Sequence, residues 1–447
     1  MSRGTVWLGL LTAAGILMAG NGANAQRADR PNIVVIMADD FGYECVGVNG
    51  GDYRTPNLDR LAAEGVRFER AYAQPLCTPS RLQLMTGQYN IRNYTRFGAL
   101  DARQQTFGHW FRAAGYRTGI FGKWQLGREK DLPQRFGFDE AVLWQHTRRP
   151  ARYANPGLEF NGVERDYRNG EFGEDLLADA VCLFLEQNKA RPFVAYYPMV
   201  LTHGPFEPPP NSPDYRRQAT GPEGDPSRRA GPRYFPDMVA HADAAVGKVL
   251  RKLDELGLRD RTLVLFTGDN GTGRPITTRF RGQALQGGKG LQQEIGMHVP
   301  LMVRLPGRIP AGRVTRDLVD FTDFVPTLLD CTGIGRPKGW TLDGHSLWPR
   351  LTGKGGAPRR WIYSWYARDG GPTGSEFARG EHLKLYRDGR LFDVEADPGE
   401  KQPLSSEGLS DAQRREYEQL HSALKKFANA RPEWTWKNVP PVQPNPD

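Results

Sequence analysis

Residues 32–40, Asn-Ile-Val-Val-Ile-Met-Ala-Asp-Asp, form a nearly unbroken apolar run that ends in two carboxylates, Asp39 and Asp40. Three later runs have the same character, since each is apolar and each leads into polar or charged residues. They are Thr118–Gly122 before Lys123, Phe193–Leu201 before Thr202 and His203, and Thr262–Thr267 before Gly268, Asp269 and Asn270. Runs this apolar are typical of central strands that are covered on both faces.

Segments typical of helices lie between these runs. They are 56–64, 106–114, 175–186 and 237–256. Such an alternation of strands and helices predicts a layered α/β domain. Because ligands of open α/β sheets bind beyond the carboxyl ends of the strands, we expect the polar residues that follow the runs to form one site.

The character of the chain changes near residue 350. Three short segments, 361–366, 383–386 and 390–394, alternate as half-exposed strands do, and Asp388-Gly389 between the last two is a strong hairpin signal. A helix is predicted over 411–428. We therefore expect a catalytic domain at 26–350, a smaller antiparallel α+β subdomain at 351–430 and a poorly ordered Pro-rich tail at 431–447.

The first 25 residues resemble a signal peptide. Arg3 supplies the positive charge, residues 6–19 the apolar stretch, and Ala23-Asn24-Ala25 a small-residue cleavage site. The stretch is short for a membrane span, and an uncleaved anchor is the lesser alternative. We expect an exported protein, periplasmic or extracellular, without a stable membrane span.

Composition limits the class of partner. The 447 residues are 38% hydrophobic and 25% charged, which is typical of a globular protein, and the net charge of +9 favours anionic partners. For an exported protein, sulfated or acidic glycans fit better than nucleic acid. Of the four cysteines, Cys182 and Cys331 are expected in the core, and no partner for Cys45 can be named.

One cysteine stands in a distinctive setting. The segment Cys77-Thr78-Pro79-Ser80-Arg81 is followed by Leu84-Met85-Thr86-Gly87. Pro79 suits the first turn of a helix and Gly87 its end, so Cys77 is predicted at a helix N-terminus, where unpaired N–H groups favour an anion. Arg81 follows one turn later and can face the same anion. Taken alone, the segment favours a buried structural cysteine before an ordinary helix.

The pattern C-x-P-x-R resembles the signature of the sulfatase family, and the resemblance extends over nearly the whole chain after residue 25. It implies an alkaline-phosphatase-like fold, with a central mixed, mostly parallel sheet flanked by helices. It also implies that a formylglycine-generating enzyme oxidises Cys77 to formylglycine, an aldehyde whose hydrate attacks the sulfur of a sulfate ester.

The same resemblance implies one calcium ion. Asp39-Asp40-Phe41-Gly42 is similar to the family's first pair of metal ligands and Asp269-Asn270-Gly271 to its second, with the modified Cys77 completing the set. Oxygen ligands of this kind suit a hard cation such as Ca²⁺.

Residues that bind sulfate and serve the leaving group are implied in the same way. They are Arg81, Lys123, His203 and Lys289. The three cations would neutralise the sulfate oxygens, and His203, helped by Lys289, would protonate the departing alcohol.

The sequence departs from the family at Gln125, where the pattern G-K-W-H-L-G reads Gly-Lys-Trp-Gln-Leu-Gly. The family's histidine is assigned a base role, and glutamine cannot take a proton at neutral pH. His298, a metal-bound carboxylate and a differently placed water are the candidates to replace it.

A basic, aromatic segment follows. Residues 144–149, with Arg152 and Tyr153, suit either a rim that binds a sugar acid or a solvated basic loop.

Two other functions remain open. A formylglycine-dependent phosphonate or phosphate ester hydrolase would use the same superfamily fold. A catalytically silent relative that binds sulfated glycans would explain Gln125. Sulfated carbohydrate is the substrate that export and basic loops favour most.

Overall fold

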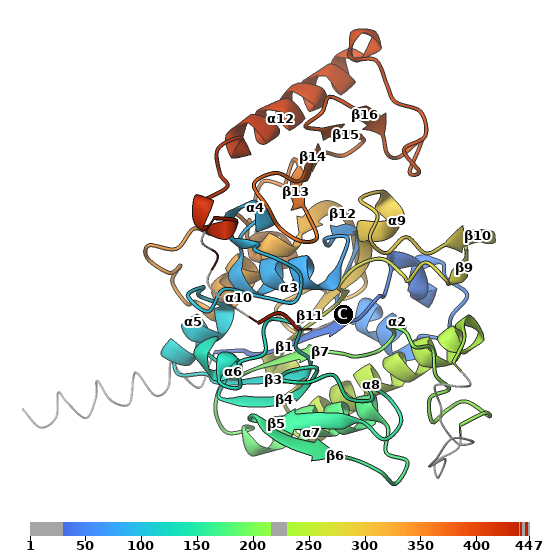
Figure 1. Cartoon of the computed structure of the whole chain (residues 1–447), viewed down its shortest axis with the longest axis vertical. Helices are drawn as coiled ribbons and strands as arrows, with labels where there is room; N and C mark the ends of the chain where they lie inside the picture. Colours follow the sequence, from blue (N-terminus) through green and yellow to red (C-terminus); the bar gives the residue numbers. More distant parts are fainter. Residues whose placement is uncertain (1–29, 216–229, 438, 440–442, 446–447) are drawn as a thin grey trace, which may run out of the picture.

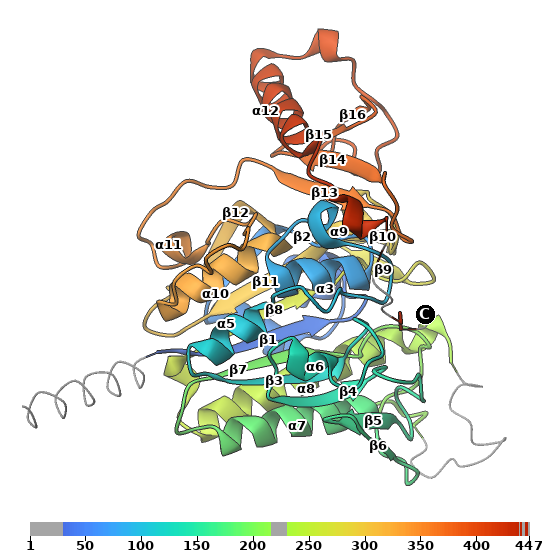
Figure 2. The ribbon, with the colours of Figure 1, turned by 60° about the vertical axis from the view of Figure 1, so that its left-hand side comes forward.

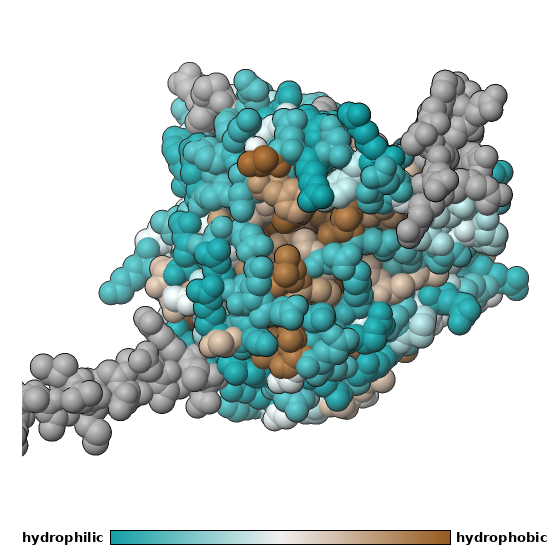
Figure 3. Space-filling model, turned by 90° about the horizontal axis from the view of Figure 1, so that it is seen from below, coloured by the Kyte–Doolittle hydropathy of each residue, from teal (hydrophilic) through white to brown (hydrophobic). Residues whose placement is uncertain are grey.

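The computed structural model describes residues 30–215, 230–437, 439 and 443–445. The predicted signal peptide lies outside these residues. Within them, no helix combines the length and the apolar character that crossing a membrane requires. Figure 3 shows one face of the molecule, on which hydrophilic residues predominate and apolar residues form a narrow central band.

A ten-stranded sheet runs through the larger part of the molecule, in the order β12-β2-β11-β8-β1-β7-β3-β4-β5-β6 (Figure 1). Its strands are β1 Asn32–Ala38, β2 Val66–Tyr72, β3 Arg117–Lys123, β4 Glu140–Trp144, β5 Gly157–Phe160, β6 Val163–Asp166, β7 Phe193–Pro198, β8 Thr262–Gly268, β11 His298–Arg304 and β12 Arg313–Asp320. The central strands β8, β1, β7, β3 and β4 are parallel, whereas β11 is antiparallel to both of its neighbours. The carboxyl ends of the parallel strands therefore share one edge.

Helices cover both faces of this sheet. They are α2 Pro56–Ala63, α3 Cys77–Thr86, α4 Asn90–Asn93, α5 Phe107–Ala113, α6 Leu132–Arg135, α7 Gly173–Gln187, α8 Phe235–Glu255, α9 Glu294–Met297, α10 Phe324–Thr332 and α11 Trp348–Leu351. Alternate side chains of β1 enter two cores, because successive residues of a strand point to opposite faces. One core includes α3, α5 and α10, and the other α2, α7 and α8.

A smaller antiparallel sheet lies at one end of the molecule, beside α12 Asp411–Phe427 (Figure 2). Its strands are β13 Ile362–Tyr366, β14 Ser375–Arg379, β15 Leu383–Tyr386 and β16 Leu391–Asp393, and a separate hairpin pairs β9 Thr277–Phe280 with β10 Gln283–Gln286. Tyr363 of β13 stacks on Phe427 of α12 with 4.3 Å between ring centroids. The predicted α/β fold with a small antiparallel C-terminal sheet is confirmed.

The strand predicted to reach Leu201 ends instead at Pro198. The carboxylate of Glu174, on α7, accepts hydrogen bonds from the backbone N–H groups of Val200 and Leu201, at 3.0 and 2.8 Å. These groups are therefore unavailable to a neighbouring strand. Glu174 also accepts from the Tyr197 hydroxyl and fixes the segment that leads to His203.

This carboxylate should make stability depend on pH. Burial raises the pKa of Glu174 from an ordinary 4.5 to about 7. The folded state therefore holds the proton more tightly than the unfolded state. Tighter proton binding by Glu174 therefore contributes in full to the free energy of unfolding below pH 4.5. As the pH rises to 7, we expect this contribution to fall by roughly 3 kcal/mol. Denaturant titrations at several pH values should show Glu174→Gln to be less sensitive, with Glu186→Gln, exposed on the same helix, as the control. Equal slopes for Glu174→Gln and the wild type would contradict this assignment.

Residues 443–445 of the predicted Pro-rich tail are described by the structure and contact the larger sheet's loops. Asn445 is 3% exposed, and its backbone N–H donates to the Gly98 carbonyl at 3.0 Å. Its side chain accepts from Gly127 N–H at 2.7 Å and donates to the carbonyls of Gln145 and His146, at 2.9 and 2.6 Å. Asn445 thus joins three loops of the larger part of the molecule.

We expect Asn445→Ala to lower the free energy of unfolding by about 2 kcal/mol, because a buried N–H and two carbonyls lose their partner. Denaturant titration measures this change. The matched control is Gln443→Ala, because Gln443 is exposed and bonds to Arg128 N–H through its backbone carbonyl. A loss as large in the control would show that the side chain of Asn445 has no special role.

Candidate active site

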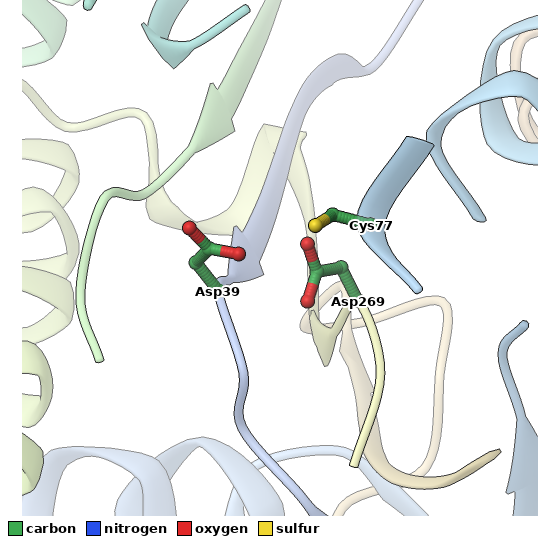
Figure 4. Close-up of side chains that lie close together, drawn as sticks. All are labelled: Asp39, Cys77 and Asp269. Carbon is green, nitrogen blue, oxygen red and sulfur yellow. The ribbon is translucent and has the colours of Figure 1, made fainter. Parts of the chain in front are cut away.

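The residues predicted at strand ends meet at the carboxyl edge of the sheet. Asp39 and Asp40 follow β1, Asp269 and Asn270 follow β8, and Lys123 ends β3. In Figure 4 the Cys77 sulfur points toward the Asp269 carboxylate, with Asp39 facing them from the neighbouring strand. Oxygen or sulfur atoms of Asp39, Cys77 and Asp269 lie within 4.8 Å of one another.

Cys77 begins α3, as predicted, and this helix ends at Gly87, which has a positive φ of 68°. The helix start is held by Ser80, whose hydroxyl accepts from Gln74 N–H at 2.9 Å and donates to the Leu76 carbonyl at 3.0 Å. Burial raises the pKa of the Cys77 thiol, although the charge of Lys123 opposes it. The thiol therefore stands neutral at a helix N-terminus, where N–H groups and the dipole favour an anionic ligand.

Buried ion pairs surround the sulfur. The Lys123 ammonium lies 2.8 Å from an oxygen of Asp39 and 3.4 Å from the Cys77 sulfur. Arg81 pairs with Asp269 at 2.9 Å and donates to the Lys123 carbonyl at 3.0 Å. Burial acts to raise the pKa of Asp39, but the nearby cations, Lys123 foremost, outweigh it and hold this pKa well below its usual value.

A second group forms around Asp40, which has a positive φ of 57°. Its carboxylate lies 2.8 Å from the Lys289 ammonium, 2.9 Å from the Asn270 amide nitrogen and 3.8 Å from His203 Nε2. His203 Nδ1 lies 2.6 Å from the Gly204 carbonyl and acts as the donor there, which leaves Nε2 facing the site. Burial lowers the pKa of His203 to about 3, although Asp40 opposes it.

The donor set suits a hard cation. Asn270 Oδ1 is buried without a hydrogen-bond partner among the described residues. Burial and the neighbouring Asp39 raise the pKa of Asp269 to about 7, so the three carboxylates cannot all be charged here at low cost. A divalent ion bound by Asp39, Asp40, Asp269 and Asn270 would satisfy the amide oxygen and relieve this repulsion.

Gln125 stands where the family has a histidine, and His298 is a candidate to replace that histidine. The two residues lie in different places. Gln125 is 3% exposed, with a positive φ of 57°, two residues after Lys123, and its Oε1 has no hydrogen-bond partner among the described residues. His298 begins β11, bonds through Nε2 to the Glu69 carbonyl at 2.9 Å and stacks on Tyr43. These contacts direct its ring to a neighbouring pocket, so the structure does not bring His298 into the cluster around Cys77.

Sequence reasoning put Arg152 on a rim or a solvated loop, but the structure buries it at the site. Its guanidinium lies 4.0 Å from the ring centroid of Trp144, and NH1 lies 3.5 Å from a carboxylate oxygen of Asp39. The sequence pattern that could have indicated this position is an arginine placed between aromatic residues. Such a pattern does not show which way the loop turns.

Known proteins resemble the chain over nearly all of its described residues. The family model described as sulfatase matches residues 31–334, and the model described as N-sulphoglucosamine sulphohydrolase, C-terminal, matches residues 288–429. Arylsulfatase A of Homo sapiens is 34% identical over 381 residues, which cover 74% of this chain and 70% of the relative. N-acetylgalactosamine-6-sulfatase of Mus musculus is 31% identical over 502 residues, which cover 95% and 91%.

A solved structure agrees with these matches. The crystal structure of Ps i-CgsB superposes with a TM-score of 0.74 at 25% identity and covers 91% of this chain and 94% of its own. The same protein has been solved in complex with k-i-k-neocarrahexaose. With a fold of the alkaline-phosphatase type and a family model that spans most of its length, this chain belongs to the sulfatases, enzymes that hydrolyse sulfuric esters.

Proposed function

We propose that this sulfatase removes sulfate from carbohydrates, with Cys77 converted to formylglycine and one calcium ion in the site. The observation that carries the proposal is the setting of Cys77. It begins a helix, contacts Lys123 and lies within 4.8 Å of two carboxylates at the edge of the sheet. A cysteine with only a structural role has no need of this surrounding charge.

Asp39, Asp40, Asp269 and Asn270 would hold the calcium ion together with the modified side chain of residue 77. When bound, the ion polarises oxygen atoms, and the hydrated aldehyde supplies the hydroxyl that attacks sulfur. The chain's own contribution is to hold this side chain at the positive end of α3, under Lys123 and beside Arg81.

Three cations would neutralise the negative charge of the substrate's sulfate group. Arg81, Lys123 and Lys289 enter the site from different segments and are positioned by bonds to Asp269, Asp39 and Asp40. Because they are fixed before the substrate arrives, they can stabilise the charge that develops on the sulfate oxygens without reorganising. Gln125 can donate a hydrogen bond to the same oxygens and cannot act as a base.

His203 would deliver the proton to the departing alcohol. Its Nδ1 is engaged by the Gly204 carbonyl, so Nε2 is the atom that faces the substrate. A bound sulfate ester adds negative charge beside this ring and so favours its protonated form. Lys289, next to Asp40, assists by adding positive charge where the alcohol oxygen departs.

Charge, the N-terminal sequence and the relatives support the two remaining parts of the proposal, a carbohydrate substrate and export. The net charge of +9 favours anionic glycans, and residues 1–25 resemble a signal peptide. Two similar proteins are described in terms of sugars: N-acetylgalactosamine-6-sulfatase by its name, and Ps i-CgsB by its structure in complex with k-i-k-neocarrahexaose.

The test joins two measurements on protein from a host that modifies such cysteines. The tryptic peptide Ala71–Arg81 is weighed, and free sulfate is measured with sulfated oligosaccharides and, in parallel, with phosphonate esters. We expect the mass of the aldehyde form and release of sulfate. Faster phosphonate hydrolysis would favour the related esterase, and an intact thiol with glycan binding but no turnover would favour a silent binding protein.

A further inference from the structure

One buried cation is not used by the proposed reaction. The Arg152 side chain is 4% exposed, yet among the described residues it pairs with a single carboxylate, that of Asp39, at 3.5 Å. Lys123 approaches the same carboxylate oxygen at 2.8 Å. Arg152 Nε is buried and has no hydrogen-bond partner among the described residues. Burying a guanidinium without a full set of hydrogen-bond acceptors is costly. The incomplete set around Arg152 therefore indicates that a ligand supplies the missing acceptors.

The position of Arg152 indicates which part of the ligand it meets. Its neighbour Tyr153 donates its hydroxyl to the carbonyls of Val200 and His203, which ties the loop to the segment that carries the proposed acid. Arg152 and Asp39 are both close enough to influence the charge of His203. The guanidinium therefore lies on the side of the site where the alcohol departs.

The surroundings also hold the guanidinium in a fixed orientation. It stacks on the Trp144 ring at 4.0 Å, and the ring of Tyr153 lies 5.7 Å from it. An aromatic face attracts the charge of an arginine beside it, and the planar guanidinium carries its N–H groups in a fixed fork that matches a carboxylate or a sulfate. The exposed Arg149 adds positive charge on the same side.

We propose that Arg152 binds a second oxyanion, a carboxylate or a further sulfate, on the sugar that carries the ester to be cleaved. This inference rests on the proposed sulfatase reaction and specifies its substrate class as doubly anionic sugars. The three cations near Cys77 are assigned to the scissile sulfate, which leaves Arg152 to bind the second charge.

The experiment compares Arg152→Met with the wild type on three substrates: a hexosamine with one sulfate, the same sugar with two, and a monosulfated uronic acid. We expect the wild type to prefer the doubly anionic sugars in kcat/KM, and the variant to lose this preference by about 30-fold, through KM more than kcat. Arg152→Lys keeps the positive charge but lacks the paired N–H donors of the guanidinium. Its preference in kcat/KM should lie between those of the wild type and Arg152→Met. The two doubly anionic sugars distinguish a carboxylate from a sulfate.

Arg117→Met is the matched control, because Arg117 begins β3 at the end of the strand opposite to Lys123. An equal loss on all substrates would overturn the proposal and make Arg152 a support for Asp39. If the wild type cleaves none of these esters, calorimetric binding to Cys77→Ala, with and without Arg152→Met, still decides. Loss of selective binding to doubly anionic sugars supports the inference, and unchanged selectivity refutes it, whether or not the proposed function holds.

Discussion

Replacement of Cys77 by Ala is expected to lower kcat for sulfate ester hydrolysis by roughly four orders of magnitude or more. The methyl group of alanine offers no atom that can become a nucleophile, while Arg81, Lys123 and the proposed metal ligands remain in place. The substrate should therefore still bind, and KM should change far less than kcat. Measurement of sulfate release under saturating substrate separates the two quantities.

Cys182→Ala provides the matched control, because Cys182 is also buried, at 6% exposure, but lies on α7 in the opposite core. It should lose some stability and keep its activity. A Cys77→Ala enzyme with wild-type kcat would eliminate the mechanism, whatever the peptide mass shows. A similar loss in both variants would point to a folding defect.

Removal of calcium is expected to have the second largest effect, a loss of activity of about 100-fold or more that calcium restores. Without the ion, Asp39, Asp40 and Asp269 stand close together, and the pKa of Asp269 rises to about 7. Binding of calcium should therefore release a proton at pH 6, which calorimetry in two buffers detects. At one hundred times its Kd, the ion should raise the free energy of unfolding by about 2.7 kcal/mol.

Magnesium is the control for this experiment. It demands stricter octahedral geometry and gives up its water reluctantly, so it should restore less activity at equal concentration. A variant such as Asn270→Ala, which loses the amide oxygen that lacks a partner, should need more calcium for the same activity. Full activity after exhaustive chelation would refute the metal assignment.

The sequence suffices for the parts of this molecule that depend on local pattern. The strand Asn32–Ala38 is predicted with the bounds that the structure has, because a fully buried strand needs apolar side chains on both faces. Its two carboxylates, and those after the strand Thr262–Gly268, then reach the same edge because parallel strands point the same way. That these residues act as proposed remains a prediction.

The remainder depends on contacts between distant segments. Nothing local shows that Glu174 would bind the backbone after β7, that Arg152 would turn inward or that Asn445 would return to the loops near Gly98. The sequence does not reveal β2 or the edge strand β12. The first half of β2 alternates buried and half-buried residues, the first half of β12 alternates half-buried and exposed ones, and both strands carry several charges. Residue patterns determine the face that an element buries but do not identify the segment it meets.

The burial of Cys77 also has a consequence for the order of events during synthesis. In the folded protein Cys77 is 1% exposed and lies beside buried ion pairs, so a maturing enzyme has no access to the sulfur. Its proposed oxidation must then take place on a chain that has not yet folded. At about 5–20 residues per second, synthesis from Cys77 to Asn445 takes on the order of 20 to 70 seconds. Asn445 is made long after Cys77, so its hydrogen bonds to Gly127 and Gln145 cannot form before then. A sequence that folded faster would leave more of its copies permanently inactive.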